Sequence, residues 1–303
     1  IDTVAGERIG HEIVKLFAAS HAADAVQSAE NIGALESLLP PLADMRDVQQ
    51  GGYHHLDVLG HTLLALHEAE RAINEPELFL PRAADAVRVW LEDAQNRAAV
   101  RLAALFHDVG KPQCRTREDG RTRFLGHSDA SAATFLDLAE RWSLPARLRR
   151  QVVKMIRLHM RPLELANSGM RAEEEGGDLR SVITLSAIRR LMRDAEPAAI
   201  GLLLLAVGDR SACRGPASEL KLRGRLYEVF DDMLVRYLEW VREQRERPRL
   251  IDGETLMEEL DLDEGPLVGK LLDAVARAWA EREIESEQEA LELARELLGD
   301  MDD

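Results

Sequence analysis

His107 and Asp108 are the residues of this chain whose types and setting point most directly to chemistry. They follow an apolar stretch, Ala103-Ala104-Leu105-Phe106, which predicts a buried helix. Burying a carboxylate beside an imidazole is costly unless both groups are paired or bind a cation, and metal coordination is a common solution. The sequence therefore predicts a metal site around His107 and Asp108.

Further side chains of metal-ligand type lie at or beside the ends of other predicted helices. Those helices are expected at residues 56–73, 98–106, 128–142 and 148–158. Imidazoles and carboxylates suit Mn²⁺, Fe²⁺, Ni²⁺, Co²⁺ or Zn²⁺, and Mg²⁺ is a further option. The candidate ligands of this kind are His61, His107, Asp108, His127, His159 and Asp209.

The order of these residues resembles the HD superfamily of metal-dependent phosphohydrolases. In that family a first His is followed by His-Asp-x-Gly-Lys and later by a last Asp, and here the motif reads His107-Asp108-Val109-Gly110-Lys111. The resemblance implies a first ion held by His61, His107, Asp108 and Asp209. Two-metal members add two histidines, which implies a second ion held by Asp108, His127 and His159, with Asp108 shared.

The expected chemistry is hydrolysis of a phosphate ester by water activated between two divalent ions. Lys111, three residues after Asp108, is expected to neutralise a phosphate oxygen or to hold the Asp108 carboxylate. Arg161 is a candidate for clamping the leaving group, and its alternative is an ordinary surface arginine. For His127 and His159 the alternatives are a hydrogen bond to a metal ligand or a direct contact with phosphate. The predicted catalytic residues are Asp108, Lys111 and Arg161.

The whole chain also resembles part of bacterial tRNA nucleotidyltransferases (CCA-adding enzymes) and poly(A) polymerases. Residues 4–16 and 33–40 are similar to the neck of those enzymes, and residues 250–257 with 265–269 to their C-terminal helical region. Nucleotidyl transfer in that family needs an N-terminal head with a Gly-rich loop and a D-x-D pair, which we do not find in these 303 residues. We therefore expect an excised C-terminal region or a head-less paralogue that does not transfer nucleotides by that mechanism.

An all-α fold is predicted from the apolar periodicity. Apolar residues recur at helical spacing, as in 63–66 and 234–241, and aromatic residues make up only 4% of the chain. The expected division is a neck-like segment at 1–50, an HD phosphohydrolase domain at 51–225 and an acidic C-terminal helical region at 226–303. The polar, glycine-rich stretch 167–178 is expected to form a mobile loop near the site.

The apolar runs and the cysteines indicate where in the cell the protein is expected. No apolar run approaches the roughly 20 residues needed to span a bilayer, and no signal-peptide pattern opens the chain. Cys114 and Cys213 stand apart without a C-x-x-C motif, which favours a reducing, cytoplasmic setting over a disulfide framework or a thiolate zinc site.

Charge is distributed unevenly along the sequence. Residues 146–250 carry 21 basic and 15 acidic side chains, whereas residues 251–303 carry 4 basic and 18 acidic ones. Basic residues gather in the predicted helix at 147–161 and again at 189–193. These arginines predict either a face that attracts phosphate or a solvated surface on which they pair with acidic residues.

Two functions of different classes follow. The first is a phosphohydrolase acting on nucleotides or RNA 3′-end phosphates, with cyclic phosphodiester opening, 2′-nucleotide hydrolysis or phosphatase activity implied by the resemblance. The second is an RNA-binding, RNA-positioning module of a tRNA nucleotidyltransferase or poly(A) polymerase, without catalysis of its own. An iron-containing site that activates O₂ is a more remote third option. Expected partners are a nucleotide or RNA end and also tRNA, but no membrane; the sequence does not indicate an oligomeric state.

Overall fold

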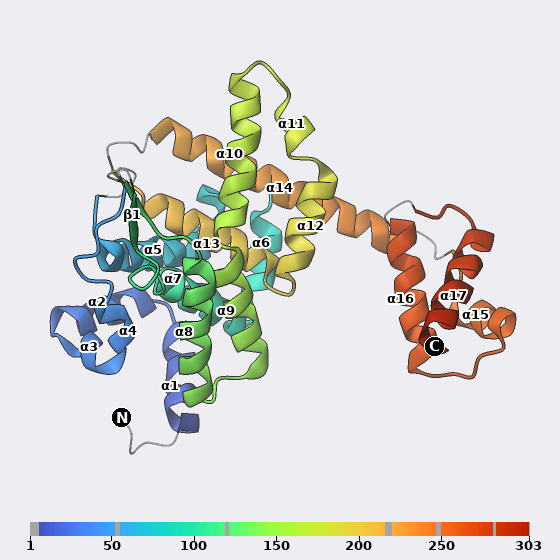
Figure 1. Ribbon diagram of the computed structural model, residues 1–303, viewed down its shortest axis with the longest axis horizontal. Coiled ribbons are helices and arrows are strands. Elements are labelled where there is room, and N and C mark those ends of the chain that lie inside the picture. Colours follow the sequence, from blue (N-terminus) through green and yellow to red (C-terminus); the bar gives the residue numbers. More distant parts are fainter. Residues whose placement is uncertain are drawn as a thin grey trace. The chain divides into compact units, whose positions relative to one another are not determined.

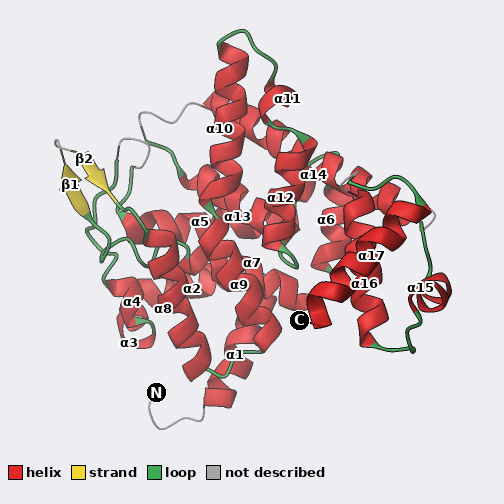
Figure 2. Ribbon diagram, turned by 45° about the vertical axis from the view of Figure 1, so that its right-hand side comes forward, coloured by secondary structure: helices red, strands yellow, loops and turns green. Residues whose placement is uncertain are grey.

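The computed structural model describes residues 6–51, 55–118, 121–215, 220–246, 250–280 and 283–302. Helices dominate these residues, and the strands among them form one short antiparallel hairpin, β1 (Thr116–Glu118) and β2 (Arg121–Arg123) (Figure 2). The predicted all-α class is confirmed. The first five residues of the predicted neck-like segment lie outside the described residues.

The chain divides into two compact units, Ile1–Tyr237 and Leu238–Asp303. The first unit opens with α1 (Gly6–Ala18), α2 (Ala22–Asn31), α3 (Ala34–Leu38) and α4 (Pro40–Ala43). The division into three parts at residues 50 and 225 remains a proposal.

The core of the first unit is α13 (Ala199–Ala212), which packs along α5 (Val58–Asn74) and against α7 (Ala94–Phe106) (Figure 1). α9 (Ala146–Leu158) packs against both α7 and α8 (His127–Arg141). The leucines at 202–205 of α13 are fully buried. The remaining elements are η1 (Pro76–Leu78), α6 (Ala84–Leu91), α10 (Met160–Glu174), α11 (Leu179–Val182), α12 (Leu185–Ala195) and α14 (Leu220–Glu246), which continues into the second unit.

Two buried carboxylates hold the ends of other helices in the first unit. Glu70 of α5 accepts hydrogen bonds from the backbone N–H groups of Ala22 and Ala23 at the start of α2, both at 3.2 Å, and from Arg101 Nε at 2.7 Å. Asp231 of α14 accepts bonds from the N–H groups of residues 82 and 83, at 3.2 and 3.1 Å, just before α6. Glu70 thereby satisfies N–H groups in the first turn of α2 that have no partner within their own helix, and Asp231 holds the chain just before α6 begins.

Helix α10 extends through most of the stretch predicted to be a mobile loop. It continues to Glu174, and Ala166 and Met170 on it are buried. It approaches the end of α11 so closely that a Cβ on Gly169 would lie 2.6 Å from the side chain of Ile183, the residue that follows α11. The loop prediction is therefore wrong for residues 167–174, because its polar residues lie on the exposed faces of a helix whose other face is packed.

The second unit has its own core and its own helix caps. Its helices are α15 (Gly253–Leu260), α16 (Pro266–Ala280) and α17 (Glu287–Asp302), whose apolar faces meet around Leu256 and Leu271. Ser286 caps the start of the last helix: its hydroxyl accepts from Glu289 N at 3.3 Å, and Glu289 accepts from Ser286 N at 3.1 Å.

Among the helices of the described residues, none combines the length and the apolar character that crossing a bilayer requires.

Candidate metal centre

Three of the predicted histidines are fixed in the same way. The Nδ1 atoms of His107, His127 and His159 lie 2.9, 2.8 and 2.7 Å from the backbone carbonyl oxygen three residues earlier in the chain. A carbonyl oxygen only accepts, so each Nδ1 is the donor. In the neutral ring, Nε2 then carries the lone pair, which is the arrangement a metal-binding histidine needs.

His61 and Asp209 reach the same place from neighbouring helices. Asp57 caps α5 by accepting from Gly60 N at 2.8 Å, and His61 follows in the first turn. Gly208 of α13 lies so close to α5 that a Cβ there would be 2.7 Å from the Ala69 Cβ atom. This close approach brings Asp209 Oδ1 within 2.9 Å of His61 Nε2.

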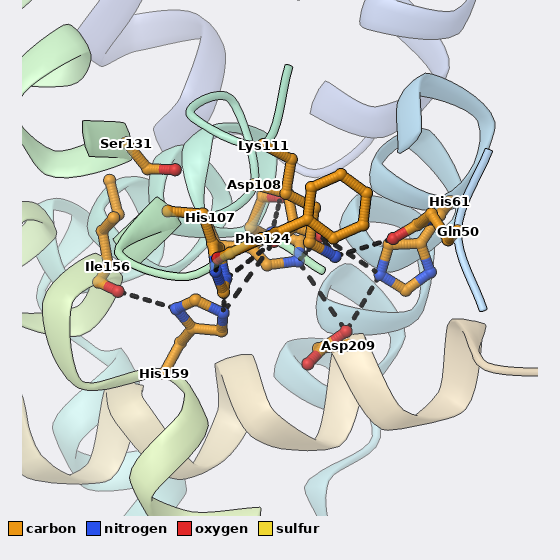
Figure 3. A network of polar contacts seen from close by, with 12 residues as sticks. Gln50, His61, His107, Asp108, Lys111, Phe124, Ser131, Ile156, His159 and Asp209 are labelled. Atoms are coloured by element: carbon orange, nitrogen blue, oxygen red, sulfur yellow. Dashed lines mark hydrogen bonds and ion pairs between the residues drawn. The ribbon is translucent and has the colours of Figure 1, made fainter. Parts of the chain in front are cut away.

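The six candidate ligands meet in two groups. One consists of His61, His107 and Asp209, and the other of Asp108, His127 and His159; within each group the ligand atoms lie within 4.8 Å of one another. Figure 3 shows His61 and His159 on opposite sides of Asp108.

The two oxygens of the Asp108 carboxylate face different groups. Oδ2 is 3.2 Å from His107 Nε2 and 3.8 Å from His61 Nε2. Oδ1 is 3.4 Å from His127 Nε2 and 3.9 Å from His159 Nε2. A carboxylate that bridges two cations requires this arrangement.

The buried atoms of this cluster fit a cation. Asp108 is 1% exposed, and neither of its oxygens accepts a hydrogen bond of good geometry from the described residues, although Lys111 Nζ forms an ion pair with Oδ2 at 2.7 Å. His107 Nε2 is likewise buried without a hydrogen-bond partner in the described part of the chain. Unsatisfied buried acceptors are rare and need an explanation. Divalent transition metals supply one, since imidazole and carboxylate together are their usual donors.

The electrostatics of the cluster are those of a site built around fixed negative charge. Burial opposes protonation of His107, but the carboxylates of Asp108 and Asp209 outweigh it and raise the pKa of His107 to about 10. Burial also disfavours the charged form of Asp108, yet His107 and Lys111 hold the pKa of that carboxyl well below its usual range. Burial and the neighbouring His107 charge lower the pKa of His159 to about 4. A bound cation would replace the proton of His107.

The His-Asp-x-Gly-Lys turn is held by close packing against α8. The N–H of Gly110 donates to the buried Ser131 hydroxyl at 2.8 Å. A Cβ on Gly110 would lie 2.5 Å from Ser131 N and 2.7 Å from His127 O, so a side chain at this position would push α8 away. The glycine therefore fixes the distance between Asp108 and His127.

Lys111 lies beside the cluster, together with two residues that the sequence did not indicate. Its Nζ donates to Gln50 Oε1 at 2.7 Å and lies 5.5 Å from the centre of the Phe124 ring. Figure 3 shows both neighbours around the lysine. Gln50 precedes α5 without any motif around it, and Phe124 follows β2; only their contacts across the fold connect them with the cluster.

The structure does not bring Arg161 to the cluster. Its Nη1 pairs with Asp194 at 2.7 Å, and it lines a separate depression with Arg190 and Leu165. The side chain turns away because Asp194 on α12 offers it a partner. Arg161 therefore has no part in the chemistry proposed below.

Several arginines of the predicted basic face are likewise paired with acidic residues. Arg147 pairs with Asp93 at 2.8 Å and Arg149 with Glu140 at 3.4 Å, while Arg157 lies 3.4 Å from residue 129. The geometry of α9 favours the interpretation of a solvated, paired surface over that of a phosphate-attracting face.

A cavity of about 720 Å³ opens onto the candidate ligands. Ligands of both groups line it, as do Lys111, Phe124 and one face of α10. Pockets for small molecules commonly have this size and combine apolar walls with a few polar groups. The cavity is therefore large enough for a molecule well beyond a phosphate ion.

Two protein families match this chain. Residues 58–212 match the HD domain, and residues 1–45 match a family described as the probable RNA and SrmB-binding site of polymerase A. The first match contains all six candidate ligands. The second coincides with α1–α4.

Curated relatives extend the similarity to nearly the whole chain. A CC-adding tRNA nucleotidyltransferase of Thermus thermophilus is 32% identical, and an A-adding tRNA nucleotidyltransferase of Deinococcus radiodurans is 31% identical; each match covers 94% of this chain. A multifunctional CCA protein of Verminephrobacter eiseniae is 31% identical over 52% of this chain and 33% of that protein. The chain covers only 55% and 57% of the first two relatives, about half of their length.

Proposed function

This chain belongs to the HD-domain family and is related over most of its length to tRNA nucleotidyltransferases, and from that premise we propose that it is a divalent-metal-dependent phosphohydrolase acting on nucleotides or RNA 3′ ends. The observation that carries the proposal is the Asp108 carboxylate, buried with two oxygens that accept no hydrogen bond and face two groups of ligands. A protein that used this region only as a scaffold would have no need for such a carboxylate.

Each group of ligands would hold one ion. His61, His107 and Asp209 form the first set and His127 and His159 the second, with Asp108 contributing to both. When bound, divalent ions supply a water of lowered pKa and stabilise negative charge on a phosphate. Mn²⁺, Fe²⁺, Co²⁺, Ni²⁺ and Zn²⁺ all suit the donors, and Mg²⁺ suits them less because it prefers oxygen.

The protein's own residues orient the ligand atoms and can neutralise negative charge on the phosphate. The carbonyl bonds to Nδ1 keep Nε2 of the three histidines directed into the cluster. Lys111, held by Gln50 at 2.7 Å, places a positive charge at the edge of the cavity, where it can neutralise a phosphate oxygen. The buried surroundings keep bulk water from screening these charges.

The test is hydrolysis of 2′,3′-cyclic AMP by metal-stripped protein resupplied with one divalent ion at a time. We expect turnover that requires metal and is lost in Asp108→Ala. Asp137→Ala, an exposed aspartate on α8, is the matched control and should keep full activity. Absence of turnover with every ion, in protein shown to bind metal, would reject the proposal.

The match of residues 1–45 to an RNA-binding family favours a second function, that of a module which positions RNA. The relatives named above are tRNA nucleotidyltransferases, so tRNA is the RNA to test. Binding of labelled tRNA, followed by fluorescence anisotropy, should weaken steeply as salt rises, because phosphate contacts release counterions. A lack of binding even at low salt would remove this second function.

A further inference from the structure

One face of α10 lines the cavity that opens onto the candidate ligands. The residues concerned are Met160, Leu163, Asn167, Met170, Arg171 and Glu174. Their spacing of three and four residues places them on one stripe of the helix. The opposite side of α10 is occupied, since Gly169 packs against Ile183. The stripe is therefore a wall of the cavity, and the packing of α10 fixes its orientation.

The stripe changes in chemistry with distance from the cluster. Met160 directly follows the candidate ligand His159, and Leu163 lies one turn further on. Asn167 follows after another turn, about 12 Å along the helix axis from His159. The wall therefore offers apolar atoms first and then an amide, with Met170, Arg171 and Glu174 beyond it. The span is on the order of the length of a mononucleotide.

From this arrangement we propose that the α10 stripe binds the base of the substrate while the cluster holds its phosphate, so that α10 determines specificity for nucleosides. This inference rests on the proposed phosphohydrolase function and names the residues that select its substrate.

The chemistry of the wall suits a nucleobase better than an alkyl or sugar phosphate. Thioether and leucine side chains pack well against a flat ring and need no hydrogen-bond partner themselves. The Asn167 amide is exposed and lines the cavity, and an amide can donate and accept at once, as the edge of a base requires. Phe124, which lines the same cavity, offers an aromatic face for stacking.

The test compares two substrates that differ only in the base. These are 2′,3′-cyclic AMP and the methyl riboside 2′,3′-cyclic phosphate, which has the same cyclic phosphodiester and no base. For the wild-type protein with its best metal ion, we expect kcat/KM to favour the nucleotide. Leu163→Ala should lower this preference about tenfold, the order expected for lost apolar contact in a binding pocket. Asn167→Ala should lower it by a similar or smaller factor.

A control on the same helix separates base binding from damage to α10. Leu165 lies on the opposite face and lines the separate depression beside Arg161. Leu165→Ala should leave the preference for the nucleotide as it is in the wild-type protein. The base-binding wall is rejected if Leu163→Ala and Asn167→Ala reduce hydrolysis of both substrates by the same factor. It is also rejected if these variants hydrolyse both substrates as fast as the wild-type protein does.

A binding measurement separates this inference from the proposed function. Calorimetry of AMP binding to the metal-loaded protein needs no turnover, and we expect Leu163→Ala to weaken the affinity about tenfold while Leu165→Ala does not. If neither cyclic substrate is hydrolysed, the proposed phosphohydrolase function is rejected, but AMP binding still tests whether the α10 stripe binds the base. If AMP binds equally to all variants or to none, the wall fails even where hydrolysis succeeds.

Discussion

Buried carboxylates occur in two kinds of surroundings in this protein. Glu70 accepts two backbone N–H bonds from the start of α2 and pairs with the buried Arg101, and Asp231 accepts two backbone N–H bonds from the residues just before α6. Asp108 is as deeply buried, yet its oxygens accept no hydrogen bond in the described structure. Its neighbours are the Lys111 amine and four imidazoles, two from each group of ligands, whose Nε2 atoms lie within 3.9 Å of its oxygens.

The difference separates two uses of the same chemical group. A carboxylate with its hydrogen bonds complete fixes the helices around it, and removing it leaves helix ends and an arginine unsatisfied. A carboxylate without them depends on neighbouring charges, here Lys111 and His107, and on a cation where one binds. From this comparison we expect Glu70 and Asp231 to serve the fold and Asp108 to serve the proposed function.

The largest expected effect comes from Asp108→Ala. Loss of the shared ligand should reduce metal-dependent hydrolysis at least about a thousandfold. The metal-free variant should also unfold at a lower denaturant concentration than the metal-free wild type, because Lys111 and His107 lose the carboxylate they face. Urea titration and steady-state kinetics measure the two effects. Metal-dependent hydrolysis that survives in the folded variant would place Asp108 with Glu70.

Glu70→Ala tests the other side of the comparison. It leaves Arg101 buried without its partner and the start of α2 uncapped, so we expect the free energy of unfolding to fall by about 3–5 kcal/mol. Metal bound per folded molecule should stay at the wild-type value. Denaturant unfolding gives the first quantity and metal analysis of the folded fraction the second. Unchanged stability with lost metal would reverse the assignment.

Metal addition should stabilise the wild-type protein through the Asp108 cluster. At a free ion concentration a hundred times the dissociation constant, binding to one site raises the free energy of unfolding by about 2.7 kcal/mol. Thermal unfolding with and without the ion measures this, with Glu70→Ala included as a variant that should respond to the same extent. A similar shift in Asp108→Ala would show that the ion binds elsewhere.

Asp231→Ala should have the smallest effect of the four. It removes two hydrogen bonds to the backbone before α6 and leaves no buried cation behind, so we expect a loss of about 1–2 kcal/mol. Hydrolysis by the folded protein should be unaffected. Glu228→Ala, three positions earlier on α14 and 2.9 Å from Arg225 Nη1, is a control for an ion pair at the surface and should cost less.

The sequence by itself determined the helical class, the family and the types of residue in the candidate site. Apolar periodicity along 63–66 and 202–206 is a local property, and the ligands follow it at helix ends, so both can be recognised without the fold. The family resemblance is confirmed by the matches to the HD domain and to tRNA nucleotidyltransferases. The metal-binding roles remain a proposal.

Only the tertiary structure decided how these residues are grouped. That Asp108 faces His107 with one oxygen and His127 with the other depends on how α7 packs against α8. Long-range contacts also pair Gln50 with Lys111, 61 positions away in the sequence, and Arg161 with Asp194. Sequence patterns report which face of a helix is apolar, but the partner of a polar side chain is set by long-range packing, which no local pattern records.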